Sequence, residues 1–527
     1  MFTHKRFGNV FAVGLLLACS SIADAQEREG ISDAALTELT SRAMSEFNVP
    51  GMAVGIIKAD KVLLAKGYGV REIGKKGKID SATLFKIASN SKAFTSAALA
   101  ILVDDGLVSW DGLVIDYIPE FRMSDPWVTA NFNVTDLLTH RSGLRSHVGD
   151  QLLWPIPNAF TRSDVIHALQ YFDLVSSFRT QYAYDNLLYI VAGEVVPRVS
   201  GTGWGEFVEN RIMRPAGMKR CFADTIPGKE MYNLATPHGE TEGDLAVIER
   251  GRIAPQRPVN VAAGGIVCSL GDMLTWARMQ LNQGTISAGT ELFSAVQSRE
   301  MWKPHTRLGI SESRSLLNGT HFYFYGLGWR LADVHGYREV SHTGGVAGFR
   351  SMVVMVPELE LGVVILTNGS RSDARNAVMN TVVRSFMPVE PVDWIQLRLD
   401  EIKADQQKEK TAVAVEDLTA EVPQACCAPD LSLFTGRYRS PWFGDVSIYM
   451  EDGRLMFASD KSPKFIGNVQ HQNGNRFIVR WTDRTMNGDA WVMFEMGENG
   501  FAAGMSMLAV SKRGDYDYKD LVFSRIE

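Results

Sequence analysis

The sequence is short of the residues and spacings that mark several large classes of protein. Five cysteines in 527 residues are too few for a disulfide-stapled scaffold of this size. Their spacing leaves any pairing among four of them open, namely Cys221, Cys268, Cys426 and Cys427. Neither C-x-x-C nor H-E-x-x-H occurs, so the usual ligand patterns of a metal site are missing. We therefore expect no metal site and no cofactor.

The sequence also has no excess of basic over acidic residues. The formal net charge is −6 at pH 7, and the sequence pI is about 6.0. Proteins that bind nucleic acid need a basic face to neutralise phosphates. Nucleic acid is therefore excluded as an expected partner.

Long hydrophobic runs are missing except at the start of the chain. Two basic residues precede an apolar run over residues 10–19, and an Ala-x-Ala site ends at Ala25. The run is too short for a transmembrane helix but is typical of a signal peptide, so we expect removal of residues 1–25 and export to the periplasm or the medium. The alternative is a lipoprotein that is anchored through Cys19.

Length and composition divide the remaining chain into two folded parts. A chain of 527 residues exceeds the size of one small core, which predicts a large domain and at least one smaller one. Between Pro388 and Pro429 the sequence is rich in charge and alanine, which is typical of a connecting segment. We therefore predict a large domain over residues 26–388, a linker over 389–430 and a small domain over 431–527.

The large domain begins and ends with strands and has helices in between. Apolar runs at residues 52–57 and 62–69 predict a hairpin, and the interrupted runs over 325–368 predict an antiparallel meander. Short helices alternate with polar loops over residues 110–204. This order predicts an α+β fold with a helical insertion, in which the first and last strands share one sheet. From residue 431 onward, short β-type runs separated by turn residues predict a small all-β domain.

A candidate catalytic pair stands at the start of a long apolar helix. Ser89 and Lys92 are three residues apart, which places the hydroxyl and the amine on one helical face. A serine hydroxyl is a weak nucleophile, and a desolvated lysine amine can supply the base that it needs. The N-terminus of a helix would also favour a developing oxyanion. Because S-x-x-K also occurs by chance, this spacing needs support from other motifs.

One supporting motif is Tyr184-Asp185-Asn186, which stands just before a predicted helix. Tyr184 is a candidate to accept the serine proton and return it to the leaving group, if nearby cations lower its pKa. Asn186 is a candidate donor to a substrate carbonyl. The alternative is an ordinary core tyrosine followed by a turn asparagine.

The other supporting motif is His342-Thr343-Gly344-Gly345, which closes a predicted strand. Its glycines would let the backbone approach the substrate, with the amides of Gly345 and Ser89 as the two oxyanion donors. The alternative is a turn with a solvated histidine.

In this order, S-x-x-K, Y-x-N and H-T-G resemble the serine β-lactamase and penicillin-recognising family, in particular its branch of class C β-lactamases, D-amino-acid peptidases and related esterases. The likeness covers about residues 30–385 and includes four further stretches in the family's order, at residues 137–144, 215–218, 263–265 and 325–329. It implies a β-lactamase-like, transpeptidase-like fold and an acyl-enzyme on Ser89, with Lys92 and Tyr184 sharing acid-base duty. How the proton transfers divide between these two groups stays open.

The main departure from the family is His342, which stands where many members have the lysine of K-T-G. An unperturbed histidine is mostly neutral at pH 7, so a fixed positive charge near the substrate carboxylate would be missing. Penicillin hydrolysis is therefore less expected. Arg350 is a candidate to restore the charge, with a surface strand arginine as the alternative. If a protonated His342 binds a carboxylate, affinity should weaken as the pH rises through its pKa.

The C-terminal β domain resembles the lipocalin-like barrel that some secreted peptidases of this family carry. This resemblance implies that the barrel covers the mouth of the active site or mediates contacts in a homo-oligomer. Covering the mouth would favour short peptides over proteins. A stability module without influence on the substrate is the alternative.

As a whole, the resemblance implies a secreted serine peptidase whose partner is a small peptide with D- or non-standard residues, such as a linearised microcystin-type peptide. The alternatives are a carboxylesterase acting on a small ester, a true β-lactamase, and a non-catalytic penicillin-binding protein. The presence of Ser89, Lys92 and Tyr184 argues against the last of these. The absence of a G-x-S-x-G turn disfavours a lipase.

Overall fold

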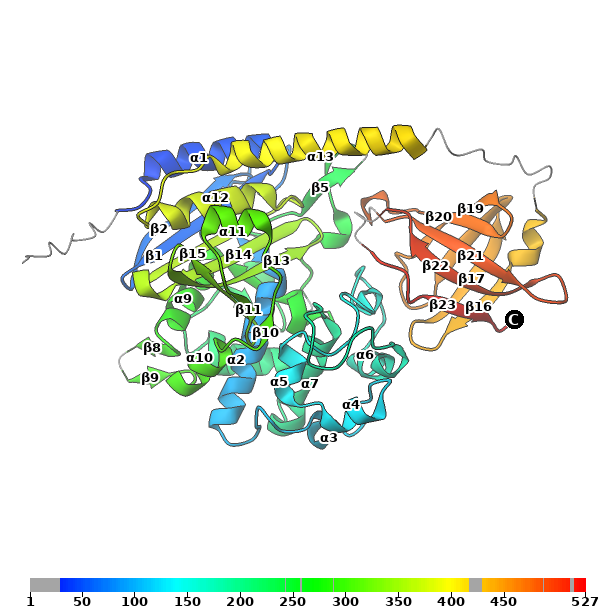
Figure 1. Cartoon of the computed structure of the whole chain (residues 1–527), viewed down its shortest axis with the longest axis horizontal. Coiled ribbons are helices and arrows are strands. Elements are labelled where there is room, and N and C mark those ends of the chain that lie inside the picture. The colour runs from blue at the N-terminus through cyan, green and yellow to red at the C-terminus, as the bar shows by residue number, and fades with distance from the viewer. Residues whose placement is uncertain are drawn as a thin grey trace, which may run out of the picture.

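The computed structural model describes residues 29–241, 243–255, 258–287, 289–416, 429–486, 488–511 and 516–527. These residues form a large α+β domain and a closed β-barrel that follows it in the chain (Figure 1). The expected signal peptide, Cys19 and the pair Cys426-Cys427 lie outside the described residues. Among the described helices, none combines the length and the hydropathy that a membrane crossing requires.

An eight-stranded antiparallel sheet forms the centre of the large domain, in the order β10-β11-β12-β13-β14-β15-β1-β2. The N-terminal hairpin joins the C-terminal meander through β1 and β15, with Met52 opposite Thr367. This confirms the predicted α+β fold with first and last strands in one sheet. The strands are β1 Gly51–Lys58, β2 Lys61–Gly69, β10 Thr306–Arg307, β11 Tyr323–Tyr325, β12 Arg330–Val334, β13 Tyr337–Val346, β14 Phe349–Val356 and β15 Leu361–Thr367.

Helices cover both faces of this sheet, which explains why its central strands are apolar on both sides. In β15, Val364 and Leu366 belong to the core that includes the helices α2 (Ser91–Asp104) and α9 (Leu270–Leu281). Val363 and Ile365 belong to the core that includes α1 (Asp33–Glu46) and α12 (Asp373–Ser385). Successive strand residues point to opposite faces, so a strand between two helical layers becomes a continuous apolar run.

The helical insertion lies between β3 and β4 in the chain and contains α3 to α8. The helices are α1 Asp33–Glu46, α2 Ser91–Asp104, α3 Val114–Tyr117, α4 Pro126–Asn131, α5 Val134–Leu138, α6 Arg162–Ala168, α7 Leu187–Ser200, α8 Trp204–Val208, α9 Leu270–Leu281, α10 Ala295–Met301, α11 Glu312–Asn318, α12 Asp373–Ser385 and α13 Trp394–Glu416. Figure 1 shows α3 to α7 gathered at the end of the domain that lies away from α1 and α13.

A disulfide joins Cys221 and Cys268 in a small sheet beside the insertion. The two residues are direct partners in the register of β4 and β7. Their strand pairing brings them together over a sequence separation of 47, which spacing alone could not reveal. This sheet contains β3 Leu84–Lys86, β4 Cys221–Phe222 and β7 Val267–Ser269, and two hairpins complete the domain, β5 His238–Thr241 with β6 Asp244–Val247 and β8 Thr285–Ser287 with β9 Thr290–Glu291.

Much of the segment that we predicted as a linker is the helix α13. Its first turn packs on the large domain, because Trp394 and Ile395 are buried and the Arg384 guanidinium of α12 lies 4.7 Å from the Trp394 ring centroid. Just before it, Asp393 pairs with Arg42 of α1 at 2.8 Å. A charge-rich composition is equally typical of a surface helix, so composition alone did not reveal this packing.

Eight antiparallel strands close into the C-terminal barrel. Large side chains fill its interior, including the buried rings of Phe457, Phe477 and Trp481, as is usual for barrels of this size. The barrel confirms the predicted small all-β domain, and its likeness to lipocalins stays a prediction. Its strands are β16 Gly436–Ser440, β17 Gly444–Glu451, β18 Arg454–Ser459, β19 Ile466–Asn473, β20 Arg476–Trp481, β21 Ala490–Met496, β22 Ala502–Ala509 and β23 Val522–Arg525.

The barrel docks on the helical insertion through aromatic and charged contacts. The Phe172 and Trp442 ring centroids are 5.0 Å apart, and Lys461 pairs with Asp164 at 2.7 Å. Arg145 of the insertion adds an ion pair to the C-terminal part of the barrel. These contacts place the barrel beside the segment that carries the predicted Y-x-N motif.

The helix that carries Lys92 is held by an aromatic stack that a mutation can test. Phe94 of α2 is fully buried and stacks on Trp276 of α9, with ring centroids 3.9 Å apart. We expect Phe94→Ala to lower the free energy of unfolding by about 3–5 kcal/mol, because it removes the contact and leaves a cavity. Urea denaturation followed by circular dichroism measures the loss.

The matched control is Val62→Ala, at a strand position whose side chain is 51% exposed. This change should cost less than about 0.5 kcal/mol. A Phe94→Ala protein no less stable than the Val62→Ala protein would contradict the packing described above.

Candidate active site

The predicted nucleophile, Ser89, lies in a short 3₁₀ turn, Ala88–Asn90, that leads directly into α2. Ala88 has a φ of +48°, an uncommon backbone conformation for a residue with a side chain. Buried hydrogen bonds tie this turn to its surroundings: Ser351 Oγ of β14 donates to the Ile87 carbonyl at 2.6 Å and accepts from Asn90 Nδ2 at 2.7 Å. The turn is therefore fixed to the sheet on one side and continuous with a buried helix on the other.

Lys92 is fully buried, and its amine faces three oxygen atoms. Nζ donates to Asn186 Oδ1 at 2.7 Å and to the Ala263 carbonyl at 2.8 Å, and it lies 3.5 Å from Ser89 Oγ. Burial lowers the pKa of Lys92 to about 7, against the opposing effect of the Asp150 carboxylate. In the neutral amine, two N–H groups satisfy the first two oxygens, and the lone pair remains for the Ser89 hydroxyl.

Tyr184 lines the same cavity as Ser89 and forms a hydrogen bond with it. Its ring centroid is 4.8 Å from Lys92 Nζ. Burial raises the pKa of Tyr184 to about 12, although the Arg330 charge and a hydrogen bond with Ser89 oppose the shift. The expected role of Tyr184 as a proton acceptor depends on cations that lower its pKa. Desolvation outweighs those cations, so Tyr184 is a neutral phenol at pH 7.

Asn186 holds Lys92 in place and is itself held by Asp150. Its amide nitrogen donates to both carboxylate oxygens of Asp150 at 3.0 Å, while its amide oxygen accepts the Lys92 bond. The nitrogen that we expected to reach a substrate carbonyl is therefore engaged within the protein. Asp150 also accepts a 2.9 Å bond from His147 Nδ1, and this bond raises the pKa of His147.

The strand β13 passes close to the nucleophile turn. It runs beyond Ser341, its last residue paired with β12, so residues 342–346 have no strand partner on that side among the described residues. A Cβ atom on Gly344 would lie 2.3 Å from the Ile87 carbonyl oxygen, so only glycine permits this approach. Gly344 thus meets the turn rather than a substrate, whereas Gly345 lines the cavity.

The structure corrects the expected role of His342. Its ring is fully buried and is not part of the cavity wall. Both ring nitrogens have partners within the protein: Nε2 lies 2.9 Å from Tyr325 Oη, and Nδ1 lies 2.7 Å from the Thr343 carbonyl. Burial, reinforced by the charges of Arg330 and Lys92, places the pKa of His342 well below its usual value. A protonated imidazole that binds a substrate carboxylate does not fit this position.

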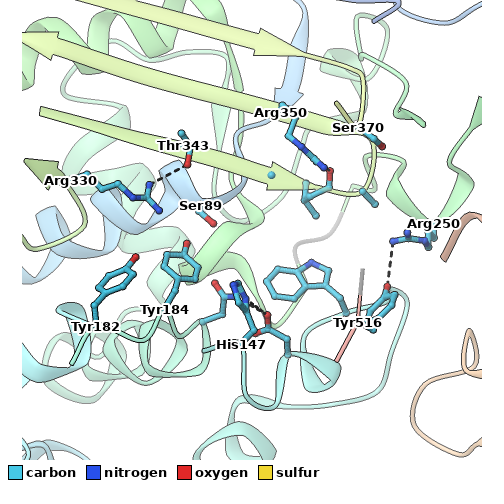
Figure 2. A pocket seen from close by; sticks show the side chains of 16 residues that line it. Ser89, His147, Tyr182, Tyr184, Arg250, Arg330, Thr343, Arg350, Ser370 and Tyr516 are labelled. Atoms are coloured by element: carbon cyan, nitrogen blue, oxygen red, sulfur yellow. Dashed lines mark hydrogen bonds and ion pairs between the residues drawn. The ribbon is translucent and has the colours of Figure 1, made fainter. Parts of the chain in front are cut away.

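Arg330, at the start of β12, supplies the fixed charge that His342 does not. Its guanidinium donates to Thr343 Oγ1 at 3.1 Å and lines the cavity together with Thr343 (Figure 2). Arg350, the sequence candidate for this charge, also lines the cavity, and its guanidinium donates to the Val346 and Phe349 carbonyls at 3.2 and 2.9 Å.

These residues surround a cavity of about 610 Å³, a size suited to a small ligand. Tyr516 of the barrel forms part of its wall and lies 3.4 Å from an Arg250 guanidinium nitrogen of the large domain (Figure 2). The cavity is therefore built by both domains. Its lining residues are Ser89, His147, Asp150, Trp154, Tyr182, Tyr184, Asn186, Arg250, Arg330, Thr343, Gly345, Val346, Ala347, Arg350, Ser370 and Tyr516.

Sequence reasoning missed several polar residues of this wall, among them Asp150, Arg250, Arg330 and Tyr516. Asp150 and Arg250 lie in short 3₁₀ helices, Asp150–Leu152 and Glu249–Gly251, that carry no recognisable motif, and Tyr516 belongs to the other domain. Arg330 did carry a signal, because it directly follows the family-like stretch at residues 325–329.

Comparison with known proteins identifies the families of both domains. A family model described as Beta-lactamase matches residues 36–386, and one described as a domain of unknown function, DUF3471, matches residues 422–525.

Two fungal proteins and one bacterial protein illustrate the relatives of this chain. It is 26% identical over 454 residues to unguisins hydrolase ungD′ of Aspergillus campestris, a match that covers 81% of this chain and 80% of that protein. It is also 26% identical over 445 residues to unguisins hydrolase ungD of Aspergillus violaceofuscus, a match that covers 78% of this chain and 76% of that protein. Protein flp of Staphylococcus aureus is 25% identical over 331 residues, with 62% of this chain and 61% of that protein covered.

Among solved structures, the octameric penicillin-binding protein homologue from Pyrococcus abyssi shares the fold. The match has a TM-score of 0.57 and 19% sequence identity, and it covers 92% of this chain and 99% of that chain. The Beta-lactamase model alone matches well over half of the sequence. The chain therefore belongs to the beta-lactamase family of serine hydrolases.

Proposed function

We propose that this chain is an exported serine peptidase that forms an acyl-enzyme on Ser89 and cleaves amide bonds in short peptides with D- or other non-standard residues. The observation that carries the proposal is the position of the Lys92 amine, 3.5 Å from Ser89 Oγ and buried so that its pKa falls to about 7. The two relatives named unguisins hydrolases support hydrolysis as the activity. Export is proposed from the leader-like sequence of residues 1–25.

In the proposed acylation, the neutral Lys92 amine accepts the Ser89 proton while Oγ attacks the substrate carbonyl. The backbone amides of Ser89 and Gly345 receive the developing oxyanion. Tyr184, which keeps its proton at neutral pH, donates to the leaving amine and recovers a proton from the Lys92 ammonium. Water then hydrolyses the acyl-enzyme. The same groups transfer the protons in this step, in the reverse order.

The cavity wall supports a small substrate with a free carboxylate. Arg330 and Thr343 form a charged, hydrogen-bonding pair beside the nucleophile, and Arg350 adds a second cation. A guanidinium is charged at every physiological pH, so carboxylate binding here does not depend on His342. At the opposite end, Tyr516 of the barrel limits the length of chain that the cavity can accept.

Three substitutions test the assignment of roles. We expect Ser89→Ala and Lys92→Ala each to abolish turnover, because they remove the nucleophile and the base. Tyr184→Phe should retain a measurable residual rate, since it removes only a proton donor. Release of amines from a panel of D-residue peptides, with p-nitrophenyl esters and nitrocefin alongside, measures the activity and identifies the preferred substrate class.

Turnover by the Ser89→Ala protein would exclude Ser89 as the nucleophile. A Lys92→Ala protein more active than Tyr184→Phe would reject Lys92 as the principal base.

The pKa of Lys92 predicts a pH dependence. Below about pH 7 the amine is protonated and has no lone pair for the Ser89 hydroxyl. We therefore expect kcat/KM to fall by about tenfold per pH unit on the acidic side and to level off above the pKa. A pH profile of kcat/KM on an uncharged ester measures this, and a flat profile from pH 5 to 8 would contradict a lysine base of this pKa.

The barrel residue Tyr516 provides a test of substrate length. We expect Tyr516→Ala to raise kcat/KM for peptides of six or more residues by roughly tenfold relative to dipeptides, because it widens the mouth. Tyr449→Ala is the matched control, at a barrel tyrosine outside the cavity wall. An unchanged length preference in Tyr516→Ala would favour a barrel that only stabilises the protein.

A further inference from the structure

A buried arginine reaches the active-site strand from the helical layer on the other face of the sheet. Arg375 belongs to α12, and its side chain is almost fully buried. One guanidinium nitrogen, Nη1, donates to the Gly344 carbonyl at 3.1 Å and to the Ser351 carbonyl at 2.9 Å. The other two nitrogens donate to the Asn376 side-chain oxygen at 3.1 and 2.8 Å.

The Gly344 carbonyl and the Gly345 N–H are the two ends of one peptide group. In a trans peptide these two groups point in opposite directions. Because the carbonyl is bound on the α12 side, the Gly345 N–H is turned the other way, and Gly345 lines the cavity beside Ser89. Arg375 therefore binds the carbonyl end of the peptide whose N–H the proposed mechanism uses as an oxyanion donor, in addition to the pairing of Gly344 with Ser351.

Arg375 brings a positive charge to this peptide as well as hydrogen bonds. Its three acceptor groups are neutral, and among the described residues no carboxylate lies within ion-pair distance of it. A buried cation without a counter-ion is costly, and strand pairing alone does not require one. A charged donor on the carbonyl end of a peptide withdraws electron density and strengthens the N–H at the other end as a donor.

We propose that Arg375 is a positioning residue that orients and polarises the Gly344-Gly345 peptide, so that the Gly345 N–H stabilises the oxyanion more strongly. This inference rests on the proposed acyl-enzyme function. It assigns a role in transition-state stabilisation to a residue that does not touch the substrate.

Two substitutions separate the charge from the hydrogen bonds. Arg375→Gln keeps a donor but removes the charge, whereas Arg375→Lys keeps the charge. Arg384→Gln is the matched control, because Arg384 is a second buried arginine of α12 whose bonds go to Asn318 and Asn380 rather than to β13. All are assayed on a p-nitrophenyl ester for which mass spectrometry shows a wild-type acyl adduct on Ser89.

We expect Arg375→Gln to lower kcat by about tenfold with KM changed less than about twofold, because an oxyanion donor acts mainly in the transition state. Arg375→Lys should recover most of the loss, and Arg384→Gln should keep the wild-type kcat. In the trapped acyl-enzyme, the infrared stretching frequency of the ester carbonyl should rise in Arg375→Gln, since a weaker donor polarises it less. A purely structural role would leave that frequency unchanged.

Three results would overturn the proposal: a wild-type kcat in Arg375→Gln, equal losses in Arg375→Gln and Arg375→Lys, or an equal loss in Arg384→Gln. If Arg375→Gln does not fold, Arg375→Lys decides the question. A carbonyl frequency and a kcat close to those of the wild type would support the role of the charge. A tenfold loss of kcat would reject it. A wild-type protein without a Ser89 adduct overturns the proposed function together with this inference. An adduct with an unaffected Arg375→Gln overturns the inference alone.

Discussion

The removal of one lysine amine from water is the constraint on which the proposed chemistry depends. Lys92 is buried where three parts of the large domain meet: α2, the start of α7 and the segment Val261–Gly265. A charged amine would pay the full desolvation penalty there, which is why its pKa falls to about 7. The same burial raises the pKa of Tyr184, so the phenol keeps its proton at neutral pH. One physical cause therefore separates the base from the acid.

The rest of the structure serves to hold the groups around that amine. The sheet fixes the nucleophile turn through Ser351, and glycine at position 344 allows β13 to pass against it. The α12 layer reaches the same peptide through Arg375 from the other face. The barrel, docked on the helical insertion, adds Tyr516 to the cavity wall. Neither domain alone encloses the site.

Local patterns revealed the parts of the site that depend on local geometry. S-x-x-K predicts a shared helical face, and strand runs of alternating or continuous hydrophobicity predict the sheet, because both follow from backbone periodicity. The depth of His342 does not follow from sequence, since it depends on Tyr325 and on packing from distant segments. Arg375 escaped notice for the same reason, because its long side chain reaches β13 from a helix that carries no motif.

Direct titration of the Lys92 amine tests the central claim. Nuclear magnetic resonance of protein labelled with ¹³C at the lysine ε-carbon, with the Lys92 signal assigned by its loss in Lys92→Met, reports the pKa of this one group. The structure predicts a transition at about pH 7. A Lys92 signal that titrates near the ordinary value of 10.5 would show a charged amine at neutral pH and would contradict the account.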